Sequence, residues 1–549
     1  MHSTKSILSN ANNASYSFGR LIVGALFLLL CGVKLTWNFN RQVDISFDDE
    51  VRYMRYGLDL FGQIHNDWGP TYTIWYKFLS LFEHQPIALY LLNYKVIVVL
   101  LPLCFFAFLY SYGISFFTAI ILSFCLLISN TNVITYPRIS SVVVSWFLIC
   151  LIIIKLSLHS KTKQYILLSF VVFLGAYARP ELMLSFFLLL GITIFYVVRN
   201  AKIKEDLLFS FPFLVFMALV FFTFKLPANT YMGKDRLYGV FCQHYTIKYI
   251  FLHKLDYSLF IDWIAFCKKQ FQGCNTFTDI IIHYPLVVLK GILENTVVFL
   301  AEIFLSISDV LFPKYLYHHT LTEVVGIVVT IVFLGVVVFS KKHRTEIYSQ
   351  FKKQQELFLI LFIFAIPGFI SALLFFPRPH YLLFLLIPII YWLAISVDVI
   401  FPIAKIKYWV IAVIAVVVFA LSPTIRQFNT PHIISGECPN QSYKALIQLL
   451  NKSSDKPHVI FSNILHLSMM TDKNFTDFSA EENFDNDKSF LKQMQDKNVD
   501  YILVTDFLLQ DLRLKKDSTW LQFIRQPEQY GFKKKYPFKG CTTYLLYKD

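Results

Sequence analysis

The sequence predicts an α-helical polytopic membrane protein that ends in a small α/β domain. Hydrophobic residues make up 56% of the chain and charged residues only 16%, whereas a soluble protein carries about 25% charge. Apolar runs of about 20 residues recur, and each is long enough to cross roughly 30 Å of hydrocarbon as a helix. After Pro423 the composition becomes a mixture of polar and apolar residues. We therefore expect a transmembrane domain over 1–423 and a separate domain over 424–549.

The apolar runs predict about eleven transmembrane helices. The run over 164–178 is short for a span. The run over 284–312 is left out, because the amphipathic stretch 279–305 is expected to lie along the membrane surface. An additional or re-entrant span there stays open. The predicted spans are 20–38, 87–110, 113–130, 139–158, 164–178, 181–198, 207–225, 322–340, 357–376, 380–400 and 407–423.

The positions of Lys and Arg predict the orientation of these helices. With a cytoplasmic N-terminus, every basic cluster between spans falls on the cytoplasmic side. The formal charge of +14 is then a consequence of topology, and no nucleic-acid partner is expected. An odd number of spans places the C-terminal domain outside the cytoplasm, so the predicted location is the inner (plasma) membrane. The basic clusters are Lys161 and Lys163; Arg199, Lys202 and Lys204; Lys341 to Arg344 with Lys352 and Lys353; and Lys405 with Lys407.

The same orientation places two long segments outside, a first outer loop over 39–86 and a long outer loop over 226–321. Cysteines in these regions and in the C-terminal domain would face an oxidising compartment. The candidate disulfides are Cys267 with Cys274 and Cys438 with Cys541. No spacing of cysteines and histidines predicts a zinc site.

The C-terminal domain alternates amphipathic helices with short apolar strands, which predicts an α/β arrangement. No glycine-rich phosphate loop precedes its helices, so nucleotide binding is not expected. The predicted helices cover 441–452, 488–497 and 517–525, and the predicted strands cover 458–461, 501–505 and 542–547.

Three adjacent acids, Asp48, Asp49 and Glu50, follow the first span. Like charges repel, and burial at a membrane edge raises carboxyl pKa values, so such a cluster is costly and indicates a base or a ligand. At helical spacing Arg52 and Tyr53 share a face with Asp49. The alternative is a solvated loop after a helix end.

Further polar residues lie before the second span and at the outer ends of later spans. His65 and Asp67 precede the turn Trp68-Gly69-Pro70, where a histidine is either structural or a substrate contact. Three arginines stand beside prolines at outer ends, against the positive-inside bias, and guanidinium groups match phosphate geometry. These are Arg138, Arg179 and Arg378; Glu181 could pair with Arg179, and His380 could add a phosphate contact.

A carboxylate that accepts an acceptor proton, together with cations that stabilise a departing phosphate, predicts group transfer from a phosphate-linked donor. The donor would be used on the outer face by an enzyme that lies in the membrane. We therefore expect the donor to be a lipid phosphate. The main alternative is a transporter or flippase of an anionic lipid-linked substrate. Against it, the spans carry few charges and no internal repeat is evident. A non-catalytic assembly protein would leave the acids and arginines unexplained.

The first outer loop, with Asp49-Glu50-x-Arg52-Tyr53 and a return of Gly69-Pro70-x-Tyr72, resembles that of the GT-C membrane glycosyltransferases. The branch it is most similar to contains the protein O-mannosyltransferases and the aminoarabinose transferase that modifies lipid A. The resemblance implies that Asp49 is the catalytic base and Glu50 its neighbour. It also implies that Arg378-Pro379-His380-Tyr381 lies near the donor phosphate.

The resemblance further implies a polyprenyl-phosphate sugar donor and a cell-envelope acceptor, which is a lipid, a glycan or a protein. Two departures stand out: the extra acid Asp48 leaves open which carboxylate is the base, and His-Asn-Asp-Trp-Gly-Pro replaces the usual Lys- or His-Pro-Pro run. No metal ligands are assigned, and a need for a divalent metal ion stays open. The candidate substrate-binding residues are Arg52, Tyr53, His65, Asp67, Tyr72, Arg138, Arg179, Glu181, Arg378, His380 and Tyr381.

Overall fold

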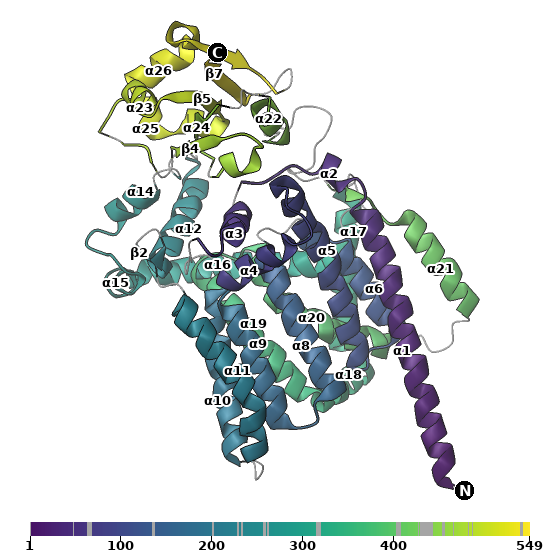
Figure 1. Ribbon diagram of the computed structural model, residues 1–549. Helices are drawn as coiled ribbons and strands as arrows, with labels where there is room; N and C mark the ends of the chain where they lie inside the picture. The colour runs from purple at the N-terminus through teal and green to yellow at the C-terminus, as the bar shows by residue number, and fades with distance from the viewer. Residues whose placement is uncertain are drawn as a thin grey trace.

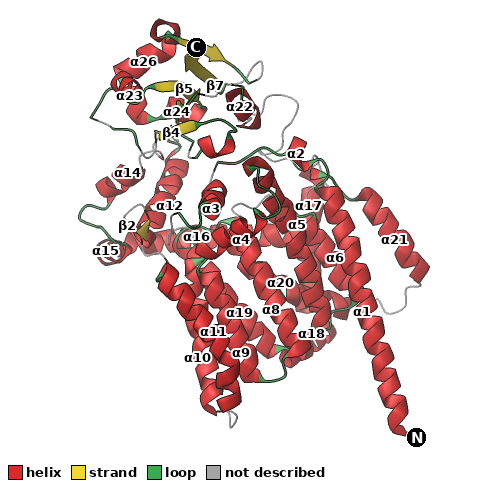
Figure 2. Cartoon of the chain, viewed as in Figure 1, coloured by secondary structure: helices red, strands yellow, loops and turns green. Residues whose placement is uncertain are grey.

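The protein consists of a helical bundle and a sheet domain that lies over one end of it (Figure 1, Figure 2). We call this end the domain-side end and the opposite one the far end. The computed structural model describes residues 2–47, 49–62, 69–133, 138–199, 203–227, 230–231, 234–255, 260, 263–313, 320–401, 408–425, 428, 443–452, 456–464, 466–480, 483–485, 487–537 and 542–548.

A helix of the bundle overlaps each of the predicted spans. Seven segments of the described chain are long and apolar enough to cross a membrane: Phe18–Gln42, Pro86–Ser111, Ile139–Ser157, Pro180–Arg199, Lys204–Phe224, Gln355–Leu374 and Pro379–Ile400. The other predicted spans correspond to α6, α9, α17 and α21, so the total number of spans stays a prediction. The helices are α1 (His2–Leu35), α5 (Pro86–Ser111), α6 (Phe116–Leu127), α8 (Ile139–Ser157), α9 (Lys161–Ala176), α10 (Met183–Arg199), α11 (Ile203–Phe224), α17 (Thr320–Phe339), α18 (Lys341–Lys353), α19 (Gln355–Leu374), α20 (Pro379–Ile400) and α21 (Tyr408–Leu421).

The loops at the domain-side end contain further short elements. They are α2 (Phe39–Gln42), α3 (Asp49–Leu58), α4 (Pro70–Leu79), α7 (Asn130–Val133), η1 (Pro180–Leu182), β1 (Thr230–Tyr231), β2 (Lys234–Asp235), α12 (Arg236–His253), α14 (Trp263–Gln270), α15 (Phe277–His283) and α16 (Pro285–Leu311). Side-chain caps define two of these helices. Asp235 accepts a hydrogen bond from the Tyr238 amide at the start of α12, and Thr276 and Asp279 form a capping box at the start of α15.

Helix α16 crosses the domain-side end of the bundle. Its Asn295 side chain donates to the carbonyl oxygens of Leu373 and Phe375, 2.9 and 3.0 Å away, where α19 ends. About 21 Å further along the helix axis, Asp309 accepts a hydrogen bond of 2.9 Å from the amide of Thr131, in α7 just after α6. Both partners lie at the same end of the bundle. Helix α16 therefore runs across the ends of bundle helices; that 279–305 lies along a membrane surface stays a prediction.

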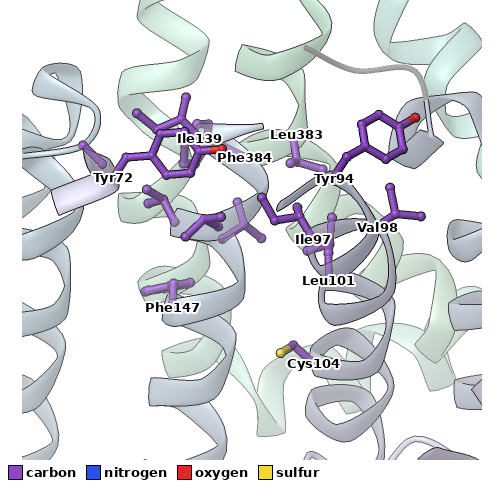
Figure 3. Packing of buried hydrophobic residues seen from close by; sticks show 14 of the residues in the cluster. Tyr72, Tyr94, Ile97, Val98, Leu101, Cys104, Ile139, Phe147, Leu383 and Phe384 are labelled. Carbon is purple, nitrogen blue, oxygen red and sulfur yellow. The ribbon is translucent and has the colours of Figure 1, made fainter. Parts of the chain in front are cut away.

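The interior of the bundle is filled by aromatic and aliphatic side chains. The buried rings of Phe147 and Phe364 stack with centroids 3.7 Å apart, and Figure 3 shows Tyr72 near Ile139 and Phe384 at the domain-side end of this core. Because lipid tails are as apolar as these side chains, dispersion between closely packed helices is the main source of stability here.

The C-terminal domain contains a five-stranded mixed sheet in the order β4-β3-β5-β7-β6. The three predicted strands are present as β3, β5 and β7. The prediction missed β4 and β6, which form the two edges; three consecutive lysines in β6 protect that edge from further pairing. The elements are α22 (Tyr443–Leu450), β3 (His458–Ser462), η4 (Ser468–Met470), β4 (Phe475–Ser479), α23 (Phe490–Asp496), β5 (Val499–Val504), α24 (Asp506–Gln510), α25 (Leu512–Lys516), α26 (Ser518–Arg525), η5 (Pro527–Tyr530), β6 (Phe532–Lys535) and β7 (Tyr544–Lys548).

The segment after α2 holds the sheet domain on the bundle. The buried carboxylate of Asp44 accepts hydrogen bonds from the amides of Tyr443 and Lys444, at 2.8 and 3.0 Å, and so caps α22. The Lys444 ammonium in turn donates to the carbonyl of Asn40, 2.9 Å away. These contacts fix the domain above α3.

The expected disulfide between Cys267 and Cys274 is wrong. Both residues and Cys242 are free thiols buried in one apolar cluster. The Cys267 thiol lies 3.9 Å from the hydroxyl of Thr246 on α12, and Cys242, one turn earlier on that helix, belongs to the same buried cluster. The packing of α12 against α14 selects these neighbours, which proximity in sequence did not indicate. Cys438 and Cys541 lie outside the described residues.

Candidate active site between the bundle and the sheet domain

The two motifs of the segment 39–86 meet in space. Helix α3 begins with Asp49 and Glu50, whose charges suit the positive end of a helix. Helix α4 begins after Gly69, which has a left-handed φ of 51°. A Cβ atom on Gly69 would lie 3.0 Å from the Ala178 carbonyl oxygen and 3.2 Å from the Tyr53 ring, so only glycine fits without displacing them. The return motif therefore packs directly against α3.

Glu50 is buried and fully engaged by the fold. Its Oε1 accepts hydrogen bonds from the hydroxyls of Tyr72 (2.5 Å) and Tyr76 (2.6 Å) and from the Asn93 amide (2.8 Å). Its Oε2 accepts one from the backbone amide of Arg138, 2.9 Å away. Burial raises the pKa of the carboxyl, and the donors lower it in part. Glu50 thus joins α3, α4, α5 and the start of α8, which favours a positioning role over a catalytic one.

Arg138 is also part of this structural junction. Its side chain is completely buried, and its guanidinium donates to the carbonyls of Asn132 and Val133. The guanidinium carbon lies 3.9 Å from the centre of the Tyr94 ring, within range of a cation–π contact. This environment fixes the Arg138 side chain at the start of α8 and leaves little access for a ligand.

Asp49 differs sharply from its neighbour Glu50. It is half-buried, and within the described part of the chain its carboxylate accepts no hydrogen bond and forms no ion pair. Its charge acts on Tyr53: burial raises the Tyr53 pKa most, Asp49 raises it further, and Arg179 and Arg236 lower it. A carboxylate that the fold does not use therefore lies in a region that also contains cations.

Arg179 forms the ion pair that the sequence offered as its structural alternative. Its Nε donates to Glu181 over 2.7 Å, and its guanidinium lies 4.9 Å from the centre of the Tyr381 ring. Burial alone would lower the Arg179 pKa, but Glu181, Tyr381 and Tyr53 together raise it. The charge is thus partly neutralised, and the pair lies beside Tyr381 at the start of α20.

Arg378 is the least engaged of the three arginines. It is partly exposed just before α20, and within the described residues its guanidinium has neither a carboxylate partner nor a hydrogen bond. It lies beside His244 of α12: burial lowers the His244 pKa most, and the charge of Arg378 lowers it further. The His244 ring stacks against Phe376 at a centroid distance of 6.0 Å. An uncompensated guanidinium in this position suits an anionic ligand.

A cavity of about 310 Å³ opens beside His244, between α12, α16 and the end of α19. Its wall combines apolar side chains with cationic ones, and Lys248 in that wall pairs with Glu294. The residues of this wall were not among the site residues predicted from the sequence. The amphipathic character of 279–305 was a signal that could have indicated part of it. The lining residues are Phe241, His244, Tyr245, Lys248, Tyr249, Leu252, His253, Val287, Lys290, Gly291, Glu294, Asn295, Leu374 and Phe375.

The remaining candidates have the following positions. Tyr72 is buried against Glu50, His380 is buried with its ring 4.4 Å from that of Tyr381, and Arg52 is half-buried on α3. Among the residues that the structure describes, no group of His, Cys, Asp and Glu side chains has an arrangement that could hold a metal ion. Asp48, His65 and Asp67 lie outside the described residues.

No protein-family model matches the chain, and no curated protein matches its sequence. The function is therefore argued from the arrangement of these side chains.

The state of His244 leads to a prediction about acid stability. Its pKa in the folded protein lies well below 6.5, so the unfolded chain binds a proton that the folded protein excludes. The stability that depends on a neutral His244 is then fully present above pH 6.5, and it is lost as the pH falls below that value. In detergent, the melting temperature of the wild type should decrease when the pH is lowered from 7.5 to 5. The melting temperature of His244→Gln should decrease less over the same range. The matched variant His253→Gln, at an exposed position, should behave as wild type; equal acid sensitivity of both variants would contradict the assignment.

Proposed function

We propose that the protein is a membrane glycosyltransferase that moves a sugar from a polyprenyl-phosphate donor to a cell-envelope acceptor. The observation that carries this proposal is the contrast between two adjacent carboxylates: Glu50 is bound by four protein donors, whereas Asp49 is unpaired within the described residues. An unpaired, half-buried carboxylate lowers the stability of the fold, so such a residue is expected to have a catalytic or binding role. The cationic neighbours of Tyr53, Arg179 and Arg236, and the partly exposed Arg378 supply the cations that such a reaction needs.

In the proposed reaction Asp49 accepts the proton of an acceptor hydroxyl. The acceptor oxygen forms a bond to the anomeric carbon of the sugar, while the bond from that carbon to the phosphate oxygen breaks. Polyprenyl phosphate leaves with the electron pair, and Arg378 stabilises its charge. A single displacement of this kind inverts the anomeric configuration. Arg179, already paired with Glu181, contributes by orienting Tyr381.

The cavity beside His244 supports a lipid-linked donor. A polyprenyl-phosphate sugar combines an anionic head with an apolar chain, and the cavity wall has both characters: Phe241, Leu252 and Val287 are apolar, while Lys248 and Lys290 are cationic. Its position near Arg378 would place the phosphate of such a donor between α12 and the start of α20.

The transport alternative receives less support from the packing. A second cavity lies at the far end and is lined by Ile360, whereas Leu374 lines the first, about 21 Å away along α19. Between them the buried rings of Phe147 and Phe364 stack at 3.7 Å. Cysteine accessibility across the bundle would separate the two functions: labelling from both ends of one path favours transport, and labelling from the domain-side end alone favours transfer.

The direct test is incubation of the purified protein with polyprenyl-phosphate sugars and extracts of cell-envelope lipids, glycans and proteins, followed by mass spectrometry. A product that is heavier by one sugar, with release of polyprenyl phosphate, is the expected result. Absence of any sugar transfer from a full set of donors would overturn the proposal. Addition of a chelator in parallel would decide whether a divalent metal ion is needed.

Replacement of Arg378 should weaken use of the donor. Arg378→Ala removes the guanidinium next to the departing phosphate, and we expect a loss of about 10- to 100-fold in kcat/KM for the donor. Arg378→Lys keeps the charge without the bidentate geometry and should recover part of that loss. Arg525→Ala, at an exposed position in the sheet domain, is the matched control. Unchanged donor kinetics in Arg378→Ala would contradict its role.

A further inference from the structure

A second cavity, of about 460 Å³, lies at the far end of the bundle, away from the candidate active site. It opens between the turn that joins α8 to α9 and the turn that joins α18 to α19. Its lining residues are Tyr112, Leu151, Ile154, Lys155, Leu158, His159, Lys161, Gln164, Lys353, Gln354, Glu356, Leu357 and Ile360.

The floor and the rim of this cavity differ in character. The floor is formed by buried apolar side chains, among them Leu151, Ile154 and Leu357. The rim is cationic, with exposed Lys155 and Lys353 on opposite sides. An ion alone would leave the apolar floor unfilled, whereas an amphiphile with an anionic head would contact both parts.

The only acidic residue in the lining, Glu356, already has partners. It forms an ion pair with Lys161 and accepts a hydrogen bond of 3.3 Å from Tyr165. Lys155 has only the Tyr112 ring, 5.6 Å from its ammonium group, and Lys353 has no ion pair in the described part of the chain. The rim therefore carries positive charge that no described carboxylate balances.

Gln354 supplies a polar group at the same place. Its amide nitrogen donates to the Tyr112 carbonyl over 3.3 Å, while its side-chain oxygen is buried and accepts no hydrogen bond from the described residues. A buried acceptor without a donor is costly, so a rotation of the amide that brings this oxygen to a ligand hydroxyl in the cavity would be favoured. Beside the cavity, Leu156 of α8 and Leu359 of α19 are exposed by 63% and 50%, as expected for surfaces that face lipid tails.

We propose that this cavity binds the head of an anionic phospholipid. The phosphate lies between Lys155 and Lys353, a headgroup hydroxyl donates to the side-chain oxygen of Gln354, and the first part of an acyl chain covers the apolar floor. Basic pockets between membrane helices commonly bind such headgroups. The site is independent of the sugar-transfer chemistry proposed above.

Native mass spectrometry of the full-length protein in detergent tests the site. The probes are phosphatidylglycerol, phosphatidylethanolamine with the same acyl chains, and glycerol phosphate, which has the head without the chains. We expect tight binding of phosphatidylglycerol only. The double variant Lys155→Gln/Lys353→Gln should weaken it by roughly thirtyfold, about fivefold for each lysine. Lys341→Gln/Lys342→Gln removes two exposed lysines at the same end, outside the cavity, and should bind as wild type.

Three outcomes would overturn the proposal. Equal weakening in both double variants would mean that binding follows overall charge. Equal binding of the two phospholipids would mean that the cations do not select the head. Equal binding of glycerol phosphate would identify a site for a free phosphate ester. If the first double variant does not fold, Gln354→Leu provides a second measurement, with an expected loss of selectivity for phosphatidylglycerol over phosphatidic acid.

Discussion

Asp49→Asn is expected to reduce sugar transfer by at least about 10²- to 10⁴-fold, the usual range for loss of a general base. The amide has the same shape as the carboxylate but cannot accept the acceptor proton. Because Asp49 makes no hydrogen bond or ion pair with the described residues, its replacement should change the melting temperature little, by no more than the effect of one charge at the start of α3. The measurement is the rate of transfer from a polyprenyl-phosphate sugar, with a thermal melt of each variant in the same detergent.

The matched control is Asp59→Asn, the same change at an exposed position of the same loop. It should retain wild-type transfer. Asp48→Asn tests the alternative base that the sequence leaves open. Near-normal transfer by Asp49→Asn would remove the assignment to Asp49, and loss of transfer in Asp48→Asn alone would move the role to that neighbour.

Glu50 should show the opposite behaviour, a large loss of stability. Glu50→Ala would remove the acceptor of three buried donors, the hydroxyls of Tyr72 and Tyr76 and the Arg138 amide. The Asn93 amide would lose one acceptor but keep the two tyrosine oxygens. Removal of one side of such a buried cluster costs on the order of 3–5 kcal/mol in the free energy of unfolding. The melting temperature in detergent should fall by several degrees, or the protein should fail to accumulate in the membrane.

Two further variants make this prediction specific. Tyr72→Phe removes one donor and should cost about 1 kcal/mol, because the remaining donors keep their acceptor. The loss of stability in Glu50→Gln should lie between those of Tyr72→Phe and Glu50→Ala. The glutamine amide keeps one acceptor oxygen but places an N–H group against another donor. A melting temperature for Glu50→Ala equal to that of Asp49→Asn would contradict the different roles of the two carboxylates.

The helical regions and three strands of the sheet were predictable because their signals are local. An apolar run of about 20 residues predicts a helix wherever it occurs, and β3 and β5 read as apolar strands between turns. The edge strands β4 and β6 were missed because edge positions accept polar residues such as the lysines of β6. Cys267 was paired with the wrong neighbour because the packing of α12 against α14 is not visible in sequence spacing.

The sequence by itself indicated a membrane protein, placed most of the apolar helices other than α1 to within a few residues, and showed which loops contain unusual charge. It left open which of the adjacent acids is the base, and it grouped Arg138, Arg179 and Arg378 as candidate phosphate ligands. Only the tertiary structure separated them, because the role of a charged group depends on the donors and acceptors that surround it. Those partners come from segments far apart in the chain: Asn93 and Arg138 surround Glu50, and Glu181 and Tyr381 surround Arg179. Asp49 and Arg378 received no such partners from the described residues, and for that reason we assign the proposed chemistry to them.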